Sequence, residues 1–360
     1  MNILVGISHP KQVHIFKNLI SELEKRGHSY CVLVNEKEIT SELLDSFNIS
    51  YKKIGSNQKG IIQKLLQLPL LTIKTFLISL KFKPDIFIGQ AIPHLAYTSY
   101  IIRKPFIVFE DTESSSLLQK IVNPFANSIV TPTSFRKDLG KKQISIRGGF
   151  ELAYLGPKCF SPDPDVLRQL GLSEGEKFVI LRFVSWNANH DIGHKGISDS
   201  NKIKVVNIFK KYAKVFISSE GPLPEELESY KFECSPVRMH HAIYYSSLVF
   251  GESATMAAEA AYLGTPSIYL DDVGRGHQDI LEDKYDLVFN FGESEEEQQK
   301  SIRKALEILK SVDKSSIEAK RKRLVAESID VNTFMLWFIE HYPESHGMMK
   351  ENPEYQDRFK

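Results

Sequence analysis

The sequence is poor in cysteine and has no excess of either charge. Its three cysteines, Cys31, Cys159 and Cys234, lie far apart. They form neither a disulfide framework nor a Cys-x-x-Cys zinc pattern, and they suit a reducing compartment. The chain has 46 Lys and Arg residues against 45 Asp and Glu residues, which leaves a net charge of +1. A nearly neutral chain has no general attraction to nucleic acid, so we expect no nucleic-acid partner.

The patterns of targeting and membrane-spanning segments are also lacking. Residues 1–10 have no basic region ahead of an apolar run, so a signal peptide is not expected. The most apolar long stretch, residues 65–80, contains Gln67, Pro69 and Lys74. It falls short of the roughly 20 apolar residues that a spanning helix needs. We therefore expect a cytoplasmic protein.

What the chain does contain is the composition of a soluble globular protein of about two domains. It has 360 residues, of which 42% are hydrophobic and 25% are charged. Short apolar runs alternate with helical stretches in both halves, for example the runs 2–6 and 30–34 on either side of a helical stretch at 12–26. Alternation of this kind predicts parallel sheets that are covered on both faces.

A segment rich in Gly and Pro, residues 150–164, separates the two halves. We predict an N-terminal Rossmann-like domain over residues 1–155, a second Rossmann-like domain over 156–330, and a C-terminal helix and tail over 331–360. Two doubly wound domains place ligands at the carboxyl ends of their strands and in the cleft between them. Candidate functional residues are therefore expected at the strand ends.

The clearest candidate is the segment 251–266, which follows a predicted strand. Ser253, Ala254 and Thr255 are small residues that open a helix, and amides at the positive end of a helix dipole suit a phosphate. Glu259 lies one turn further along and could meet the same ligand through a ribose. The alternative is an N-capped helix that small residues pack against a sheet.

The same segment resembles the nucleotide-sugar motif of two-domain GT-B enzymes. The run Ser-Ala-Thr-Met-Ala-Ala-Glu, followed by Ala-Ala-x-Leu-Gly-x-Pro, is similar to segments of the non-hydrolysing UDP-N-acetylglucosamine 2-epimerases and of the N-acetylglucosaminyltransferase of lipid II synthesis. In those families the start of the helix binds the UDP diphosphate and the Glu binds the ribose. The two glycines of the epimerase motif are replaced here. The resemblance implies nucleotide-sugar contacts from Ser253, Ala254, Thr255, Met256 and Glu259.

Further segments match a known pattern in order along the chain, at 9–19, 111–113, 151–155, 182–196, 218–222 and 251–266. Through these segments the chain resembles, over most of its length, an uncharacterised family, domain of unknown function 354, which is itself thought to be GT-B-like. The resemblance implies an α/β fold of the GT-B type, with two Rossmann-like domains facing a central cleft. The first domain is then the acceptor side and the second the nucleotide-sugar side.

Two groups of residues in the first half could supply a catalytic base. His9 and His14 follow the first strand, and a His can take a proton from an acceptor hydroxyl near neutral pH. His14 with Ile-Phe after it resembles the Gly-His-x-Phe loop of the lipid II enzyme, although it could simply cap or pack the first helix. Asp111 and Glu113 follow the strand 106–109, where crowded carboxylates can have raised pKa values. They resemble the His-x-Glu of the epimerases, and a solvated, helix-capping loop is the alternative.

Further candidates follow the first two strands of the second half. Arg182 and Lys195 offer charged donors and Trp186 offers a flat face, which together suit a diphosphate and a sugar or base. Ser219 and Glu220 lie in the next loop at a strand end, near the expected nucleotide base. For that loop a plain turn is the alternative.

The stretch 60–82 is apolar and basic. Such a helix can lie on an anionic membrane face, and it can equally cover the sheet of the first domain. We favour the sheet-covering helix. In the alternative, in which the helix contacts lipid, the protein would bind peripherally to the inner face of the membrane. The lysines in and beside the stretch are Lys59, Lys64, Lys74, Lys81 and Lys83.

Together these features predict an inverting GT-B glycosyltransferase that moves a sugar from a UDP-sugar to an envelope or lipid-linked acceptor. The segment 190–194 contains two His residues and an Asp, but GT-B enzymes usually manage the leaving diphosphate with helix dipoles and basic side chains. We therefore predict no metal and no cofactor beyond the donor substrate. The alternatives are a UDP-sugar 2-epimerase, against which an incomplete set of epimerase acids argues, and a non-catalytic nucleotide-sugar-binding protein.

Overall fold

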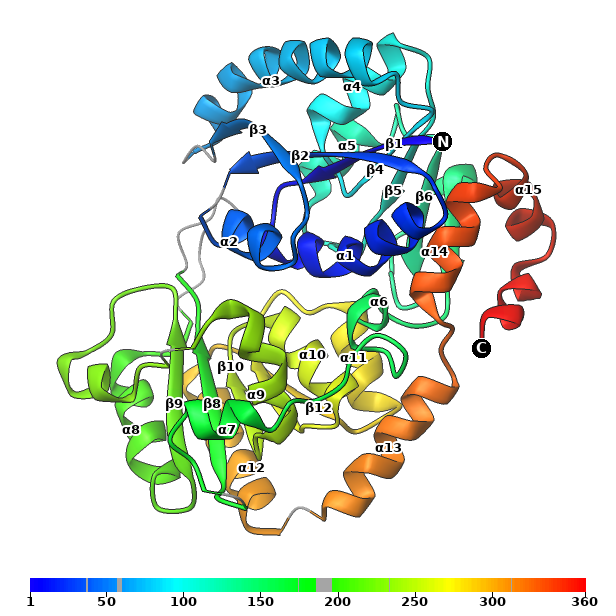
Figure 1. Cartoon of the computed structure of the whole chain (residues 1–360). Coiled ribbons are helices and arrows are strands. Elements are labelled where there is room, and N and C mark those ends of the chain that lie inside the picture. The colour runs from blue at the N-terminus through cyan, green and yellow to red at the C-terminus, as the bar shows by residue number, and fades with distance from the viewer. Residues whose placement is uncertain (37, 57–59, 174, 186–195, 233, 312) are drawn as a thin grey trace. The chain divides into compact units, whose positions relative to one another are not determined.

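The computed structural model describes the chain apart from residues 37, 57–59, 174, 186–195, 233 and 312. The chain forms two compact units (Figure 1). Unit 1 comprises Met1–Cys159 together with Glu327–Lys360, and unit 2 comprises Phe160–Ala326. The C-terminal segment therefore returns to the first unit.

Unit 1 is built on a parallel sheet. Its strands are β1 (Asn2–Ile7), β2 (Ser29–Glu36), β3 (Tyr51–Ser56), β4 (Ile86–Gly89), β5 (Phe106–Phe109), β6 (Ser128–Pro132) and β7 (Gln143–Ile146). They lie in the order β3-β2-β1-β4-β5-β6-β7. Ile3, Leu4 and Val5 of β1 are fully buried, because a sheet that helices cover on both faces buries successive side chains of a central strand.

The helices of unit 1 follow the predicted alternation. The first of them begins at a His9 cap with Pro10 in its first turn, and its Phe16, Leu19 and Leu23, three or four residues apart, are fully buried. The helices are α1 (Pro10–Lys25), α2 (Glu38–Ser46), α3 (Ile61–Phe82), α4 (Pro93–Ile101), α5 (Ser116–Val122), α6 (Leu152–Leu155), α14 (Val331–Glu340) and α15 (Glu344–Glu351), with the 3₁₀ helices η1 (Gly140–Lys142) and η4 (Pro353–Phe359).

Unit 2 has a second parallel sheet, in the order β12-β11-β10-β8-β9. Its strands are β8 (Phe178–Phe183), β9 (Lys214–Ser219), β10 (Leu248–Gly251), β11 (Ser267–Leu270) and β12 (Val288–Phe291). Its helices are α7 (Asp165–Gln169), α8 (Asp199–Phe209), α9 (Met239–Tyr245), α10 (Ala254–Leu263), α11 (Gly276–Asp283), α12 (Glu295–Ser311) and α13 (Lys314–Ala326), with the 3₁₀ helices η2 (Glu225–Tyr230) and η3 (Pro236–Arg238).

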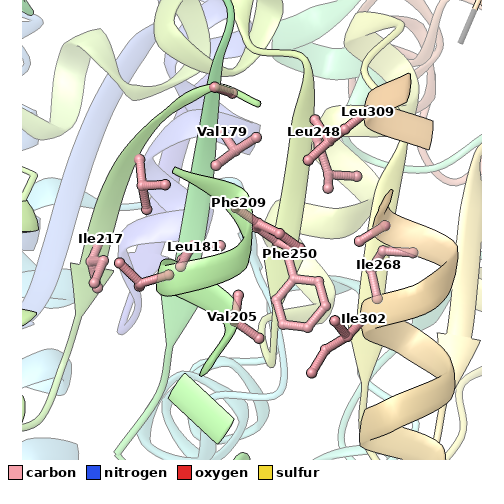
Figure 2. Packing of buried hydrophobic residues seen from close by; sticks show 14 of the residues in the cluster. Val179, Leu181, Val205, Phe209, Ile217, Leu248, Phe250, Ile268, Ile302 and Leu309 are labelled. Carbon is pink, nitrogen blue, oxygen red and sulfur yellow. The ribbon is translucent and has the colours of Figure 1, made fainter. Parts of the chain in front are cut away.

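One face of the second sheet packs under α8 and α12 (Figure 2). Phe209 of α8 meets Phe250 of β10 edge to face, with the ring centroids 5.5 Å apart. Ile302 and Leu309 of α12 belong to the same buried cluster as Ile268 of β11. These contacts fix the two helices over the sheet. The predicted α/β fold with two Rossmann-like domains is confirmed.

Each sheet has a point at which the chain changes the side on which it adds strands. This switch point lies between β1 and β4 in unit 1 and between β8 and β10 in unit 2. The loops beyond the carboxyl ends of the two strands diverge at such a point, and ligands of doubly wound sheets bind there. In unit 2, Gly251 lies at this switch point as the last residue of β10, and its φ is +153°.

We predict that Gly251→Ala strongly destabilises unit 2. A Cβ at this position would lie 2.0 Å from the carbonyl oxygen of Arg182, so the ends of β8 and β10 would have to separate. The expected cost is about 3 kcal/mol or more in the free energy of unfolding, measured by chemical denaturation. Gly347→Ala is the matched control, because a Cβ there meets nothing within 4 Å. Equal stability of the two variants would contradict the prediction.

Helix α3 differs from our expectation of a buried sheet-covering helix. Leu71, Thr75 and Ser79 face the core and are at most 5% exposed, whereas Leu66 and Leu70 are 75% and 52% exposed. The helix therefore covers the sheet with one narrow face only. By length and composition alone, its part Leu65–Phe82 could cross a membrane, and 17% of that part is buried. The preferred sheet-covering role is confirmed for the inner face, whose Leu71 packs into the core. Only the outer face departs from it, because the sequence is apolar on both sides of the helix and does not show which side packs.

Candidate functional site

Lys11 is the centre of a polar cluster at the switch point of unit 1. The first turn of α1 supplies Lys11, the loop after β5 supplies Asp111, and Glu151 precedes α6. The Lys11 Nζ lies 2.7 Å from the Asp111 Oδ2 and 2.8 Å from the Glu151 Oε1. The Glu151 side chain is 2% exposed, against 15% for Lys11 and 11% for Asp111. Asp111 and Lys11 thus keep a small exposed fraction, whereas Glu151 is buried.

Two glutamines orient the Asp111 carboxylate from its other side. The Gln90 amide, beyond the end of β4, donates to the Asp111 Oδ1 at 3.0 Å. The Gln12 amide in turn donates to the Gln90 Oε1 at 2.8 Å, and the Gln12 Oε1 accepts the backbone N–H of Ser8. Asp111 is therefore held through both of its oxygens, which fixes its orientation before any ligand binds.

The charges in this cluster are set by burial and by the neighbouring groups. Burial acts to lower the pKa of Lys11, but the charges of Asp111 and Glu151 outweigh it and raise that pKa above its ordinary value. Burial, with a contribution from the Asp111 charge, raises the pKa of Glu110 to about 8. Lys11 thus stays cationic and Glu110 carries a proton at neutral pH.

The pKa of Glu110 predicts a pH-dependent effect of Glu110→Gln. Between pH values of about 4.5 and 8 the unfolded carboxyl has lost its proton and the folded one retains it, so the wild type loses stability as the pH rises. The variant lacks this group, and its stability relative to the wild type should rise across that window by a few kcal/mol, at about 1.4 kcal/mol per pKa unit. Denaturant titrations at several pH values measure the difference. Glu42→Gln at an exposed site is the control, and a flat difference for Glu110→Gln would contradict the assignment.

The other predicted catalytic residues lie in different surroundings. His9 is exposed and caps α1, with its Nδ1 accepting the backbone N–H of Lys11 at 3.2 Å. His14 is 7% exposed, and its ring contacts those of Phe47 and Tyr154 at centroid distances of 5.8 and 5.4 Å. His14 therefore occupies the packed face of α1. Its role as a base, like that of His9, stays a prediction.

Glu113 is tied to the loop after β6. Its carboxylate accepts the backbone N–H of Arg136 at 2.6 Å, and its carbonyl accepts the Lys137 ammonium. The structure thus brings Asp111, but not Glu113, into hydrogen-bond contact with Lys11 among the contacts it describes. A catalytic role for Glu113 stays a prediction.

In unit 2, Arg182 lies near the end of β8, and its side chain contacts residues at and just beyond the end of β9. Its guanidinium donates to the Ser218 Oγ at 2.7 Å and pairs with the Glu220 carboxylate. The neighbouring Ser219 donates through its hydroxyl to the carbonyl of Gly221 at 2.9 Å. Arg182 and Glu220, predicted separately, are therefore neighbours. Trp186 and Lys195 lie outside the described residues.

Helix α10 begins as predicted at Ser253, whose hydroxyl accepts the backbone N–H of Met256 at 3.3 Å. Ser253, Ala254 and Thr255 are half-buried at this end, and Met256 is buried. The amides of the first helical turn point out of the helix end. This arrangement suits a phosphate, which remains a prediction for these residues.

Glu259 lies further along α10 and is 5% exposed. Its Oε1 lies 3.0 Å from the Nε2 of His240 on α9. A ribose at Glu259 would therefore share the carboxylate with His240 or displace it. The ribose role stays a prediction, and His240 is a partner that the sequence did not indicate.

Sequence reasoning also missed Glu252, which braces the loop beyond β8. Its carboxylate accepts the backbone N–H groups of Val184 at 2.9 Å and Ile197 at 2.5 Å, and its own N–H donates to the Arg182 carbonyl at 3.0 Å. The side chain is 5% exposed. An acidic residue directly after a buried strand was the available signal. Gln90 in unit 1 is likewise a polar residue directly after a buried strand, β4.

Solved structures of other proteins share this architecture. The UDP-GlcNAc 2-epimerase of Neisseria meningitidis bound to UDP-GlcNAc superposes with a TM-score of 0.65 at 13% identity, covering 91% of this chain and 99% of that chain. The glycotransferase of kitacinnamycin gives a TM-score of 0.63 at 10% identity, covering 94% and 98%. At such identities the likeness shows the fold, which is that of proteins with two Rossmann-like domains.

Sequence comparison finds a related protein and a matching family. The uncharacterized protein MJ0665 of Methanocaldococcus jannaschii is 23% identical over 282 residues, which are 74% of this chain and 81% of that protein. The family described as protein of unknown function DUF354 matches residues 1–285. Because this match covers most of the sequence, the chain belongs to the DUF354 family.

Proposed function

We propose that this protein is a GT-B glycosyltransferase that transfers a sugar from a UDP-sugar to an envelope or lipid-linked acceptor in the cytoplasm. The observation that carries the proposal is the Lys11 cluster at the switch point of unit 1, where an oriented Asp111 meets a fixed cation. A nucleotide-sugar site in unit 2 is supported by the epimerase of the same fold, which binds UDP-GlcNAc. The glycosyltransferase of the same fold supports transfer as the reaction class.

Asp111 is the best-placed general base. In the proposed reaction an acceptor hydroxyl gives its proton to the Asp111 carboxylate while its oxygen forms the new bond to the sugar C1. The bond between C1 and the UDP oxygen breaks, and UDP leaves with the electron pair. Attack from the face opposite to UDP inverts the configuration at C1. Lys11 and Gln90 contribute by holding the carboxylate in one orientation.

The leaving diphosphate needs positive groups from unit 2. The first turn of α10 offers backbone amides and the positive end of the helix dipole, and Arg182 offers a guanidinium that is already oriented by Ser218 and Glu220. Stabilisation of developing charge by such preset donors is commonly the largest contribution to catalysis. Gly251 allows the start of α10 and the end of β8 to approach closely enough to act on one ligand.

Turnover with and without acceptor tests the proposal. The purified chain is incubated with a panel of UDP-sugars and with candidate acceptors, and released UDP is measured. We expect UDP release that requires an acceptor. UDP release that is equally fast without acceptor would indicate hydrolysis or elimination and would contradict transfer, and no turnover of any UDP-sugar would favour a binding protein.

Epimerisation is the second candidate because an epimerase shares the fold over 91% of this chain. It would remove and re-add UDP on one sugar, so it needs no acceptor. Deuterium from heavy water would then enter at C2 of the UDP-sugar. Mass spectrometry of the recovered UDP-sugar separates the two reactions, since transfer leaves C2 unlabelled.

A further inference from the structure

The outer side of α3 carries an apolar stripe that faces solvent in unit 1. Successive members lie three or four residues apart, so they align along one side of the helix. Each is more than half exposed. Soluble monomers rarely expose a continuous apolar surface of this kind without a partner. The outer stripe consists of Ile62, Leu66, Leu70, Ile73, Leu77 and Leu80.

Helix α4 widens this apolar surface. It runs beside α3 (Figure 1), and its Tyr100 and Ile101 are 68% and 56% exposed. A groove of about 550 Å³ lies between the two helices, lined by Leu65, Pro69 and Ile73 of α3 and by these two residues of α4. The lining is mostly apolar, which suits a hydrocarbon chain rather than a polar ligand. Exposed tyrosine beside aliphatic side chains is typical of proteins at a membrane interface.

The charge around this surface is strongly one-sided. Residues 47–109, which include α3 and α4, hold nine Lys or Arg residues and one acidic residue, Asp85. The acidic residue is itself paired, with its Oδ1 3.6 Å from the Lys104 Nζ. Since the whole chain is nearly neutral, the rest of it is acidic. Lys81, Lys83 and Arg103 are exposed where the two helices end, so positive charge borders the apolar surface.

The buried side of α3 excludes a spanning role for the folded helix. Leu71 packs into the core of unit 1, and the buried Thr75 hydroxyl lies 3.0 Å from the Nδ1 of His94 on α4. The Lys74 ammonium donates to the carbonyl of Ile54 at 2.8 Å. Full insertion would break these contacts and expose the core. Only the outer stripe is available, which is the geometry of a helix lying in the plane of an interface.

We propose that the outer stripe of α3, with the groove beside α4, docks unit 1 onto the surface of an anionic lipid bilayer. The apolar side chains enter the boundary between headgroups and acyl chains, and Lys81, Lys83 and Arg103 meet anionic headgroups. A second copy of the chain is a poorer occupant, because two such basic faces would repel each other. The docking does not depend on sugar transfer, so it can stand or fall separately from the proposed function.

Vesicle co-sedimentation tests the docking. The full chain is mixed with vesicles of phosphatidylcholine and phosphatidylglycerol, and with vesicles of phosphatidylcholine alone, at low and high salt. We expect binding to the anionic vesicles at low salt and weaker binding at high salt, because salt screens the lysines. Absence of binding to anionic vesicles at low salt would overturn the proposal.

Variants show whether the outer stripe is the contact. The double variant Leu70→Gln with Leu77→Gln should lower the affinity for anionic vesicles about tenfold or more, because two leucine side chains are no longer transferred from water into the bilayer. Both positions are over half exposed, so the variant should fold. Ile39→Gln with Met348→Gln, at exposed apolar sites elsewhere in unit 1, is the control and should bind as the wild type does. Equal binding by both double variants would overturn the proposal.

Two further measurements distinguish the other occupants. Sedimentation velocity without vesicles would show a dimer if a second copy covers the stripe, and loss of that dimer in Leu70→Gln with Leu77→Gln would overturn bilayer docking. If alkaline carbonate does not extract the protein from the vesicles, the helix is inserted across the bilayer, which would overturn docking on the bilayer surface. Turnover with a water-soluble acceptor should be the same in this double variant as in the wild type. If the proposed enzyme function is wrong, both proteins will lack turnover; if only the docking is wrong, both will turn over and both will bind vesicles equally.

Discussion

Replacing Asp111 with Asn should reduce turnover by about 100- to 10,000-fold, the range expected when a general base is lost. The Asn side chain keeps the shape of Asp, but it cannot take a proton at neutral pH. Its single amide oxygen can accept from either Lys11 or Gln90, whereas Asp111 accepts from both. The affinity for UDP should stay unchanged, because Asp111 lies in unit 1 and the proposed nucleotide contacts lie in unit 2. Released UDP gives the rate, and calorimetry gives the affinity.

The rival bases are tested in the same assay. Glu113→Gln and His14→Ala should each retain most of the turnover if Asp111 is the base. His14→Ala removes a ring that packs against Tyr154, so its thermal stability must be compared with that of the wild type before its rate is interpreted. Full activity of Asp111→Asn together with loss in His14→Ala would move the role to His14, as the resemblance to the lipid II enzyme suggested.

The sequence predicted the fold well because the fold depends on local patterns. The apolar runs of β1, β8 and β10 and the periodic face of α1 are readable in short windows, and Ser253 marked the start of α10 one residue before it begins. The return of α14 to unit 1 was not readable. It depends on which apolar surface the helix meets after more than 150 intervening residues of unit 2, and no local pattern encodes that choice.

The site was predicted less completely because it is assembled from loops far apart in the chain. Asp111 was found through its strand end, but its contact with Lys11, 100 residues away, depends on the strand order β1-β4-β5. Glu151, 140 residues from Lys11, joins them because α6 packs against α1. The same holds for the pair of His240 and Glu259. The exposed face of α3 entered the sequence analysis only as the alternative to a sheet-covering helix, for a different reason. Leucine on both sides of a helix predicts burial in a soluble core unless a lipid surface is the partner.

The second large effect is expected at Glu259. If its carboxylate binds the ribose hydroxyls of UDP, Glu259→Ala should weaken UDP binding by about 1–3 kcal/mol, the scale of hydrogen bonds to a charged group. That corresponds to roughly 5- to 150-fold in the dissociation constant measured by calorimetry. The substitution also breaks the buried pair with His240, so a lower affinity alone does not identify the ribose contact.

Two comparisons isolate that contact. His240→Gln removes the imidazole from this contact and keeps the Glu259 carboxylate, so it should bind UDP nearly as the wild type does. A uridine diphosphate that lacks both ribose hydroxyls should bind the wild type and Glu259→Ala equally, because the interaction removed from the protein is already absent from the ligand. If His240→Gln loses as much affinity as Glu259→Ala, or if the dideoxy ligand still distinguishes the two proteins, Glu259 acts by holding α9 against α10. The ribose would then have to bind elsewhere in unit 2, with the Arg182 and Glu220 pair as the next residues to test.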